Sequence, residues 1–452
     1  MAVGAVSIRA TCLGAIFAFF ILFVTASVAS TEEFSTVYLQ AAATSPTLAR
    51  ARSLLKADEA TLAVAKSNLL PHLSAAAGVG GQNLDMKGFG QSFDLPLPSI
   101  EDTYHDAAYS VSLTQPIIDG QAWVGVRQAN SLIRSGQAAV LAAEQDLIAE
   151  VADAYFGVLK AEAEERVSRN HKELLRTVLN QTEAFLKVGS GDIIAVQEAK
   201  AGLDGAEAAL IRSRNAVIIS RQRLERLTHQ SIGRLVDLGP LTPEGPNPNV
   251  VGPWLDTARE NQPLLNQARQ QFDVALDEVE IQRRAHWPKL HLGAGYSYDK
   301  GSFLPTLEAN RARIGLNVSV PLYEGGQISA KTRRAAAQAK ASEYRLKDLE
   351  DQVVLDTQNA FSGLQNSVPE FLAAQQAVAS NLTSLEATRK GYEIGSRSVV
   401  DLLKVANDYE VAQRNYYLAL YSQVVSRIRL KAAVGILSEE DVKAVNALLR
   451  KD

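Results

Sequence analysis

The side chains that most often carry enzymatic chemistry are few and scattered in this sequence. Six histidines occur without metal-ligand or catalytic spacing: His72, His105, His171, His229, His286 and His291. There is no phosphate-binding loop, no His-Glu-x-x-His zinc motif and no serine-centred nucleophile elbow in the sequence. The adjacent carboxylates Glu439-Glu440 are typical of a solvated helix start. We therefore predict that the protein is not an enzyme and that it needs neither a cofactor nor a metal.

Cysteine chemistry is excluded on similar grounds. Cys12 is the only cysteine, and residues 1–30 have the features of a cleaved secretory signal. Arg9 provides the positive charge, residues 12–24 the apolar core, and Ser27-Val28-Ala29 the small residues that precede cleavage after Ala29 or Ser30. Because the mature chain then has no cysteine, disulfides and thiol-bound metals are ruled out. Export without cysteine is typical of a bacterial periplasmic or outer-membrane protein.

Charge and hydropathy narrow the partners further. The formal charge of the whole chain is −4, and it becomes −5 when Arg9 is removed with the signal. This mild acidity without a basic patch predicts no nucleic-acid partner. After residue 30 no stretch is long and apolar enough for a membrane helix. Any insertion into a membrane must therefore use strands.

One stretch combines a helix stop, a helix start and a group of polar side chains. It runs from Lys390 to Asn407, where helical sequence ends at Gly395 and restarts at Ser398 with Asp401 three residues later. That spacing is a capping-box pattern. An earlier copy occupies residues 185–199, with matching residues at Val188, Gly189, Ser190, Val196 and Ala199. Two helical hairpins with turns of one design imply a duplicated protein.

The elements that flank these turns are long helices. Residues 121–187 contain no proline and little glycine, which predicts a helix of about 65 residues and ~100 Å. A second helical stretch runs to about Gln230, and the later hairpin joins a helix ending at Ile394, with a kink at Pro369, to one from Ser398 to about Val434. Shorter helical segments cover 33–70 and 254–286, and Pro46 and Pro263 interrupt them.

Four short segments change to a period of two, which indicates strands. They cover residues 73–80, 109–114, 290–298 and 314–320, and each has an apolar face and a small or polar face. Polar loops are expected at 81–105 and 299–312. Pro116 and Pro321 close the second and fourth strands.

The spacing of matching residues supports an internal duplication. Pro46 and Pro263 are 217 residues apart, as are Pro71 and Pro288, whereas Gly189 and Gly395 are 206 apart. The offset falls because the first outer loop is longer. The predicted organisation is a signal, a first repeat of one helix, two strands and a long hairpin, a connector, a second repeat and a C-terminal tail, at residues 1–30, 31–230, 231–253, 254–436 and 437–452.

Strands with one apolar face are typical of membrane barrels, but four strands cannot close a barrel, since the smallest have about eight. An open sheet in lipid would leave edge hydrogen bonds unsatisfied. Closure therefore requires several copies, and three copies give twelve strands, although spacing alone also permits four. The alternative is a periplasmic four-stranded sheet packed on helices. The weakly hydrophobic second face argues against it.

The junction segments 113–120 (Leu-Thr-Gln-Pro-Ile-Ile-Asp-Gly) and 318–326 (Val-Ser-Val-Pro-Leu-Tyr-Glu-Gly-Gly) resemble the strand-to-helix junctions of TolC-like outer-membrane channels. Residues 391–403 are similar to that family's inner hairpin turn, and residues 431–442 to the end of its last long helix. The resemblance covers nearly the whole mature chain.

The resemblance implies a mainly α protein with a small β part, forming a homotrimer. A twelve-stranded outer-membrane β-barrel, with four strands from each chain, would continue into a long periplasmic α-helical barrel. The hairpin tips would meet a periplasmic adaptor linked to an inner-membrane transporter of ABC, RND or MFS type. The expected function is the exit duct of a tripartite efflux pump or a type I secretion system, gated at the tips.

The resemblance also assigns gate residues. Asp401 matches a pore-facing aspartate, and three copies would form a carboxylate ring that attracts cations. The alternative is that Asp401 only completes the capping box with Ser398. Lys404 stands where a second acidic residue is expected, so it would neutralise part of the ring or pair with Asp401.

Tyr392 and Arg397 match residues that hold the inner hairpin closed. Their partners would fall at Ile194 and Ala195, which lack polar side chains, so Asp192 or Gln197 would have to substitute. Arg397 can equally be a solvated turn cation. The candidate adaptor contacts are the residues of both turns: Val188, Gly189, Ser190, Ile394, Gly395 and Ser396. The alternative is that the two glycines only end their helices.

Two other classes of protein compete with the channel. A soluble periplasmic adaptor also carries a long helical hairpin, but normally one hairpin with an all-β remainder. A structural coiled-coil protein would not explain the alternating segments bounded by prolines. Neither alternative forms a pore.

Overall fold

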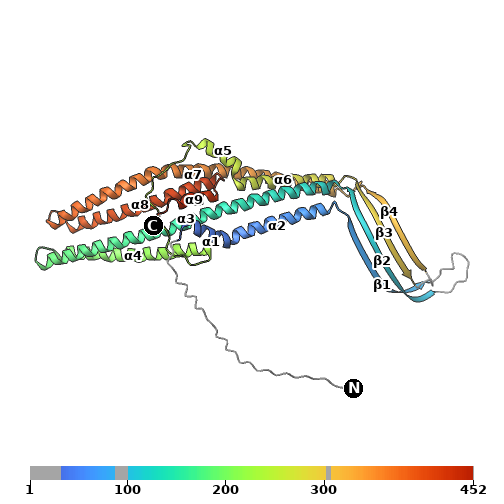
Figure 1. Cartoon of the computed structure of the whole chain (residues 1–452), viewed down its shortest axis with the longest axis horizontal. Coiled ribbons are helices and arrows are strands. Elements are labelled where there is room, and N and C mark those ends of the chain that lie inside the picture. The colour runs from blue at the N-terminus through green and yellow to red at the C-terminus, as the bar shows by residue number, and fades with distance from the viewer. Residues whose placement is uncertain (1–31, 87–99, 302–306, 451–452) are drawn as a thin grey trace, which may run out of the picture.

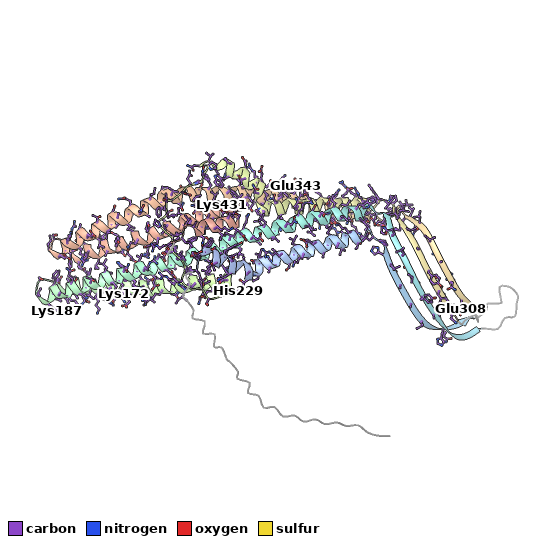
Figure 2. The ribbon with its side chains drawn as sticks, in the orientation of Figure 1. Lys172, Lys187, His229, Glu308, Glu343 and Lys431 are labelled. Carbon is purple, nitrogen blue, oxygen red and sulfur yellow. The ribbon has the colours of Figure 1, made fainter. Side chains whose placement is uncertain are left out.

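The computed structural model describes residues 32–86, 100–301 and 307–450. The signal predicted at residues 1–30 lies outside these ranges, as do parts of both predicted outer loops, at 87–99 and 302–306. The described chain is elongated, with a sheet at one end and two helical hairpins at the other (Figure 1). Figure 2 shows this separation in two side chains, because Lys187 lies at a hairpin tip and Glu308 toward the far end of the sheet.

Two very long helices form the body of the molecule, as the sequence predicts. α3 (Gly120–Lys187) has 68 residues and α7 (Gln327–Glu393) has 67. At 1.5 Å per residue each is ~100 Å long. Each packs against the shorter helix that follows it, α4 (Ile193–Thr228) or α8 (Val399–Ala433). Pro369 lies inside α7, which continues helically on both sides.

Four shorter helices pack along the halves of α3 and α7 that lie nearer the sheet. They are α1 (Phe34–Thr44), α2 (Pro46–Ser67), α5 (Val251–Asn261) and α6 (Pro263–Arg284). The predicted breaks at the two prolines are confirmed, since each proline begins a new helix, where its missing N–H costs nothing. α2 packs on α3, and α6 packs between α3 and α7 (Figure 1).

The four strands form one antiparallel sheet in the order β1-β2-β3-β4. Their bounds are β1 (His72–Met86), β2 (Ile100–Ile118), β3 (Lys289–Gly301) and β4 (Leu307–Ser319). The strands are longer than predicted, because residues 81–86, 100–105, 299–301 and 307–312 pair as strand where the sequence indicated loop. Backbone pairing with an adjacent strand continues there although the side-chain alternation has faded.

The register gives the sheet two different faces. Tyr109 pairs with Tyr298, Val111 with Tyr296, and Leu292 with Leu316. This apolar face thus carries large side chains, exposed in the single chain, that include Leu73, Val79, Ile314, Leu316 and Val318. Tyr109 stacks on Tyr298 with ring centroids 4.9 Å apart. The opposite, polar face carries serines, threonine, asparagine, glycines and charged residues.

The main hydrophobic core lies near the middle of the helical body. Aromatic residues of α1, α3 and α8 meet there, and Phe34, Tyr155 and Phe156 are almost completely buried. The segment 231–253 packs against this core through Leu235 and Leu238. The short helix α9 (Glu439–Asn446) packs near α1. The C-terminal tail and the segment between the repeats therefore bind to the middle of the molecule.

Candidate functional site at the hairpin tips

Both hairpin turns use the same backbone device. Gly189 has a φ of 77° and Gly395 a φ of 75°, a left-handed conformation that favours glycine. The N–H of Ser190 donates to the Phe185 carbonyl at 3.0 Å, and the N–H of Ser396 donates to the Gly391 carbonyl at 2.8 Å. Together with the bonds from the Gly189 N–H to the Leu186 carbonyl and from the Gly395 N–H to the Tyr392 carbonyl, they form two Schellman motifs.

The helices that leave the two turns begin differently. At α4, Asp192 accepts a hydrogen bond from the N–H of Ile194 at 3.2 Å. At α8, Ser398 and Asp401 form the predicted capping box, which is confirmed. The N–H of Ser398 donates to Asp401 Oδ2 at 3.1 Å, and the N–H of Asp401 donates to Ser398 Oγ at 3.1 Å. The Ser398 hydroxyl also donates to Asp401 Oδ2 at 2.9 Å.

Asp401 is held as an anion by its surroundings. Its pKa lies below the usual carboxyl value because it accepts hydrogen bonds from the backbone N–H and the hydroxyl of Ser398, and because the charges of Arg397 and Lys404 are near. Lys404 is exposed, and within the described ranges its ammonium makes no ion pair with Asp401. Its charge acts through space rather than through the i,i+3 contact considered from the sequence.

Tyr392 is buried at the inner hairpin and ties it to the outer one. Only 9% of the residue is exposed, and its hydroxyl lies 3.0 Å from Thr182 Oγ1 on α3. Thr182 Oγ1 donates its own proton to the Val178 carbonyl at 2.7 Å. Tyr392 is therefore the donor and Thr182 the acceptor. The Tyr392 ring also packs against Phe185, with centroids 5.8 Å apart.

The partner of Tyr392 is thus not one of the residues considered from the sequence. Asp192 and Gln197 lie beyond the turn, whereas Thr182 lies before it, on the other helix of the outer hairpin. Sequence reasoning missed Thr182 because a lone threonine within a long helix resembles any other. Its one signal is position: it shares a helix face with Val178 and Phe185, which lie four residues before and three after.

Arg397 lies at the exposed end of the inner turn. Among the residues that the structure describes, its guanidinium makes no hydrogen bond or ion pair. Its aliphatic stem covers Gly391, where an added Cβ would stand 2.7 Å from Arg397 Cγ. Gly391 is therefore needed for close approach of the arginine. The exposed cation remains available to a partner or to a second copy of the chain.

A small hydrophobic cluster joins the four helices of the two hairpins close to their turns. We call it the tip cluster, and its fully or nearly buried members are Leu175, Val178, Ala199, Ala206, Leu385, Tyr392, Val399, Leu402 and Ala406. In the turns themselves apolar side chains are exposed to solvent, since Val188 is 77% and Ile394 81% exposed. Two exposed apolar residues at the ends of turns are suited to contact with another protein.

A buried pair of ionisable side chains lies on the side of the tip cluster that faces away from the turns. His171 on α3 places Nε2 3.7 Å from Glu410 Oε2 on α8, with side chains 9% and 5% exposed. Arg414 approaches the other Glu410 oxygen at 3.2 Å. Burial lowers the pKa of His171. Sequence reasoning placed no role on these residues, because they are 239 positions apart and only packing of α3 on α8 brings them together.

Within the described parts of the chain, no helix is both long and apolar enough to cross a membrane. No cluster of three or more His, Cys, Asp or Glu side chains in those parts has the geometry to hold a metal ion.

A four-stranded sheet with one apolar face, joined to paired ~100 Å helices, is the protomer architecture of outer-membrane channel-tunnels. Comparison with known proteins agrees with that class. The chain matches the family described as "Outer membrane efflux protein" over residues 37–229 and 254–436. The protein belongs to this family of TolC-like outer-membrane proteins.

Individual relatives cover most of the chain. It is 29% identical over 425 residues to the outer membrane protein TolC of Vibrio cholerae, which spans 93% of this chain and 94% of that protein. It is 28% identical to the alkaline protease secretion protein AprF of Pseudomonas aeruginosa, over 77% of this chain and 73% of that one. Its fold matches the CmeC outer membrane channel of Campylobacter jejuni with a TM-score of 0.78 at 16% identity, over 93% and 90% of the two chains.

Family membership fixes the class and the location. The protein is an outer-membrane exit duct with a periplasmic part, and its family consists of conduits rather than enzymes. This separates it from the periplasmic adaptor and from the structural coiled coil, the two classes that the sequence left open.

Proposed function

We propose that three copies of this chain close into a twelve-stranded barrel continuous with a helical tunnel. The observation that supports this proposal is the sheet: β1 and β4 each have one paired edge within the chain, and one face is apolar and exposed. Unpaired edges in lipid cost several kcal/mol for each polar group. Pairing β4 of one copy with β1 of the next gives these edge groups hydrogen-bond partners. The apolar face then remains in contact with lipid.

The duct is proposed to act with a periplasmic adaptor and an inner-membrane transporter of ABC, RND or MFS type. The exposed turn residues Val188, Gly189, Ser190, Ile394, Gly395 and Ser396 are the proposed adaptor contacts. Relatives named for protease secretion and for efflux both occur, including AprF and the outer membrane efflux protein BepC of Brucella suis. We therefore propose that this chain serves either tripartite efflux or type I secretion.

The periplasmic gate is proposed to consist of Asp401, Lys404, Tyr392 and Arg397. Tyr392 holds the inner hairpin against α3, and the inner hairpin must move away from α3 for the entrance to widen. Asp401 is ionised, so three copies at the entrance would present three carboxylates to a passing ion. Lys404 and Arg397 reduce that negative charge, and we expect weaker cation selectivity than a purely acidic ring would give.

The proposal is tested by single-channel recording of the purified, signal-cleaved protein in a planar bilayer. Long-lived discrete conductance steps are expected, together with a trimeric mass in detergent. The matched variant Val318→Asp places a charge on the apolar face, where it would meet lipid, and should prevent stable trimers. The variant Asn317→Asp changes the neighbouring residue on the polar face and should assemble normally. Folded protein that never inserts would contradict the barrel.

A further inference from the structure

Arg313 on β4 is a cation on the polar face of the sheet, and its charge has no partner in the described chain. β4 pairs with β3 so that Arg313 stands opposite Gly295, and Gly295 in turn stands opposite Ser112 on β2. Tyr296 and Val111 belong to the other face. If the apolar face contacts lipid, Arg313 points into the lumen of the barrel.

The contrast with its neighbour Arg311 isolates the charge of Arg313. Arg311 lies on the same face, and its guanidinium donates to Asp299 Oδ2 at 2.8 Å. Lys289, also on that face, is paired with Asp119 at 3.1 Å. These two cations are neutralised by carboxylates of the same chain. Arg313 is not.

A neighbouring copy has no described side chain that would neutralise it. In the proposed trimer, β1 of the next copy pairs with the free edge of β4. The polar-face positions of β1 between residues 72 and 80 carry no carboxylate in any register, since they are His72, Ser74, Ala76, Gly78 and Gly80. On β2, Asp106 is six residues from Ser112, or ~20 Å along the strand, beyond the ~10 Å screening length at 0.1 M salt.

The surface around Arg313 is hollow, and hydrogen-bonding side chains form part of its lining. A cavity of about 630 Å³ lies over this part of the sheet, and its lining includes Ser112, Ser297, Arg311, Arg313 and Asn317. Its floor includes Gly293, Gly295 and Gly315, and a Cβ built on Gly295 would meet only the Val111 carbonyl within 4 Å. An unpaired guanidinium beside hydroxyl and amide groups is the chemistry that recognises carboxylates, phosphates and sulfonates.

We propose that Arg313, with the hydroxyls and the amide around it, forms an anion-binding site in the barrel lumen, one in each subunit, for the negatively charged groups of molecules in transit. This inference depends on the proposed barrel. The site lies at the opposite end of the molecule from Asp401, so the duct would present anions at its entrance and cations near its exit. A cargo that carries both charges meets a complementary group at each end.

The test uses thiol chemistry, because the chain has no cysteine once Cys12 is removed with the signal. A cysteine at Ser112→Cys reports the potential near Arg313. It is reacted in membrane-inserted trimers with an anionic and a cationic methanethiosulfonate of similar size, in 50 mM salt. We expect the anionic-to-cationic rate ratio to fall about twofold when Arg313→Gln is added, because one charge ~10 Å away, two strand spacings across the sheet, acts oppositely on the two reagents. Arg313→Lys should retain the ratio.

Two matched positions make the result decisive. Ser110→Cys lies across the sheet from the neutral Arg311–Asp299 pair, so Arg313→Gln should change its ratio less. Val111→Cys is on the apolar face and should react with neither reagent. If Ser112→Cys reacts with both reagents at a ratio that Arg313→Gln leaves unchanged, the anion site is wrong and the barrel stands. If Val111→Cys reacts and Ser112→Cys does not, the faces are reversed and the barrel proposal fails as well.

Discussion

The two hairpin turns differ in side chains but not in backbone. Gly189 and Gly395 adopt nearly the same φ, 77° and 75°, and each ends its helix with the same pair of hydrogen bonds. The first turn then exposes Ile193 and Ile194, whereas the second carries Arg397, Asp401 and Lys404. Both turns share the backbone geometry that reverses the chain, and after it the first carries the single carboxylate of Asp192 where the second carries three charged side chains. The side chains of the proposed gate therefore lie on the inner hairpin alone, whereas the turn geometry is common to both hairpins.

The largest difference between the hairpins should appear in their packing. Leu402 is fully buried in the tip cluster, and the residue 206 positions earlier, Val196, is 8% exposed and outside that cluster. Leu402→Ala should lower the local free energy of opening of α8 by about 3 kcal/mol, because it leaves a cavity among four helices. Val196→Ala should cost clearly less. Native-state hydrogen exchange of the two hairpins measures both free-energy losses, and equal losses would show that the two hairpins are packed equally tightly.

The turns themselves should respond alike. Gly395→Val and Gly189→Val each force a branched side chain into a left-handed conformation, at a cost of about 1–2 kcal/mol. Hydrogen exchange of the two or three residues after each glycine gives the values. Gly→Asn at either position is the tolerant control, since asparagine visits this conformation more readily. Costs that differ by more than 1 kcal/mol between the turns would show that their equivalence is only apparent.

The tie between the hairpins should be worth about 1 kcal/mol, since Tyr392→Phe removes one buried hydrogen bond. The position 206 residues earlier is Leu186, which has no hydroxyl, so the first hairpin offers no equivalent tie. Thr182→Val removes the acceptor from the other side. The two changes should be non-additive in a double-mutant cycle, and each should raise the mean channel conductance. Strict additivity would mean that the 3.0 Å contact contributes nothing.

The capping box should make the inner hairpin sensitive to acid. The pKa of Asp401 is lowered in the folded chain, so its contribution is complete above the usual carboxyl range and is lost as pH falls through the lowered value. Fraying of α8 should therefore increase below about pH 4, as followed by hydrogen exchange of the first turn of α8 measured at acid pH. Asp401→Asn should remove this dependence. A dependence that persists in the variant would assign it to another group.

The smallest effect concerns ions at the entrance. Asp401→Ala should weaken block by multivalent cations applied from the hairpin side, and Lys404→Gln should strengthen it, each by about twofold at 0.1 M salt because exposed charges are screened. Asp192→Ala in the outer hairpin is the matched control and should leave block unchanged. Block that is indifferent to Asp401 would leave it with the capping role alone.

Local patterns were sufficient wherever the cause of a structure is local. The absence of proline over 121–187 specified α3, the glycines specified the turns, and the spacing of Ser398 and Asp401 specified the capping box. Alternation located part of each of the four strands. It did not locate their ends, because residues 81–86 and 100–105 are held by pairing with each other rather than by their own side-chain pattern.

Periodicity and motifs read within a few residues were enough to predict the long helices, part of each of the four strands and the family. Only the tertiary structure decided which distant side chains meet. Tyr392 reaches Thr182 across 210 residues, His171 reaches Glu410, and Asp299 neutralises Arg311 but leaves Arg313 alone. The physical reason is that charge pairing and hydrogen bonding act over about 3–4 Å, and the packing of whole helices and strands sets such distances.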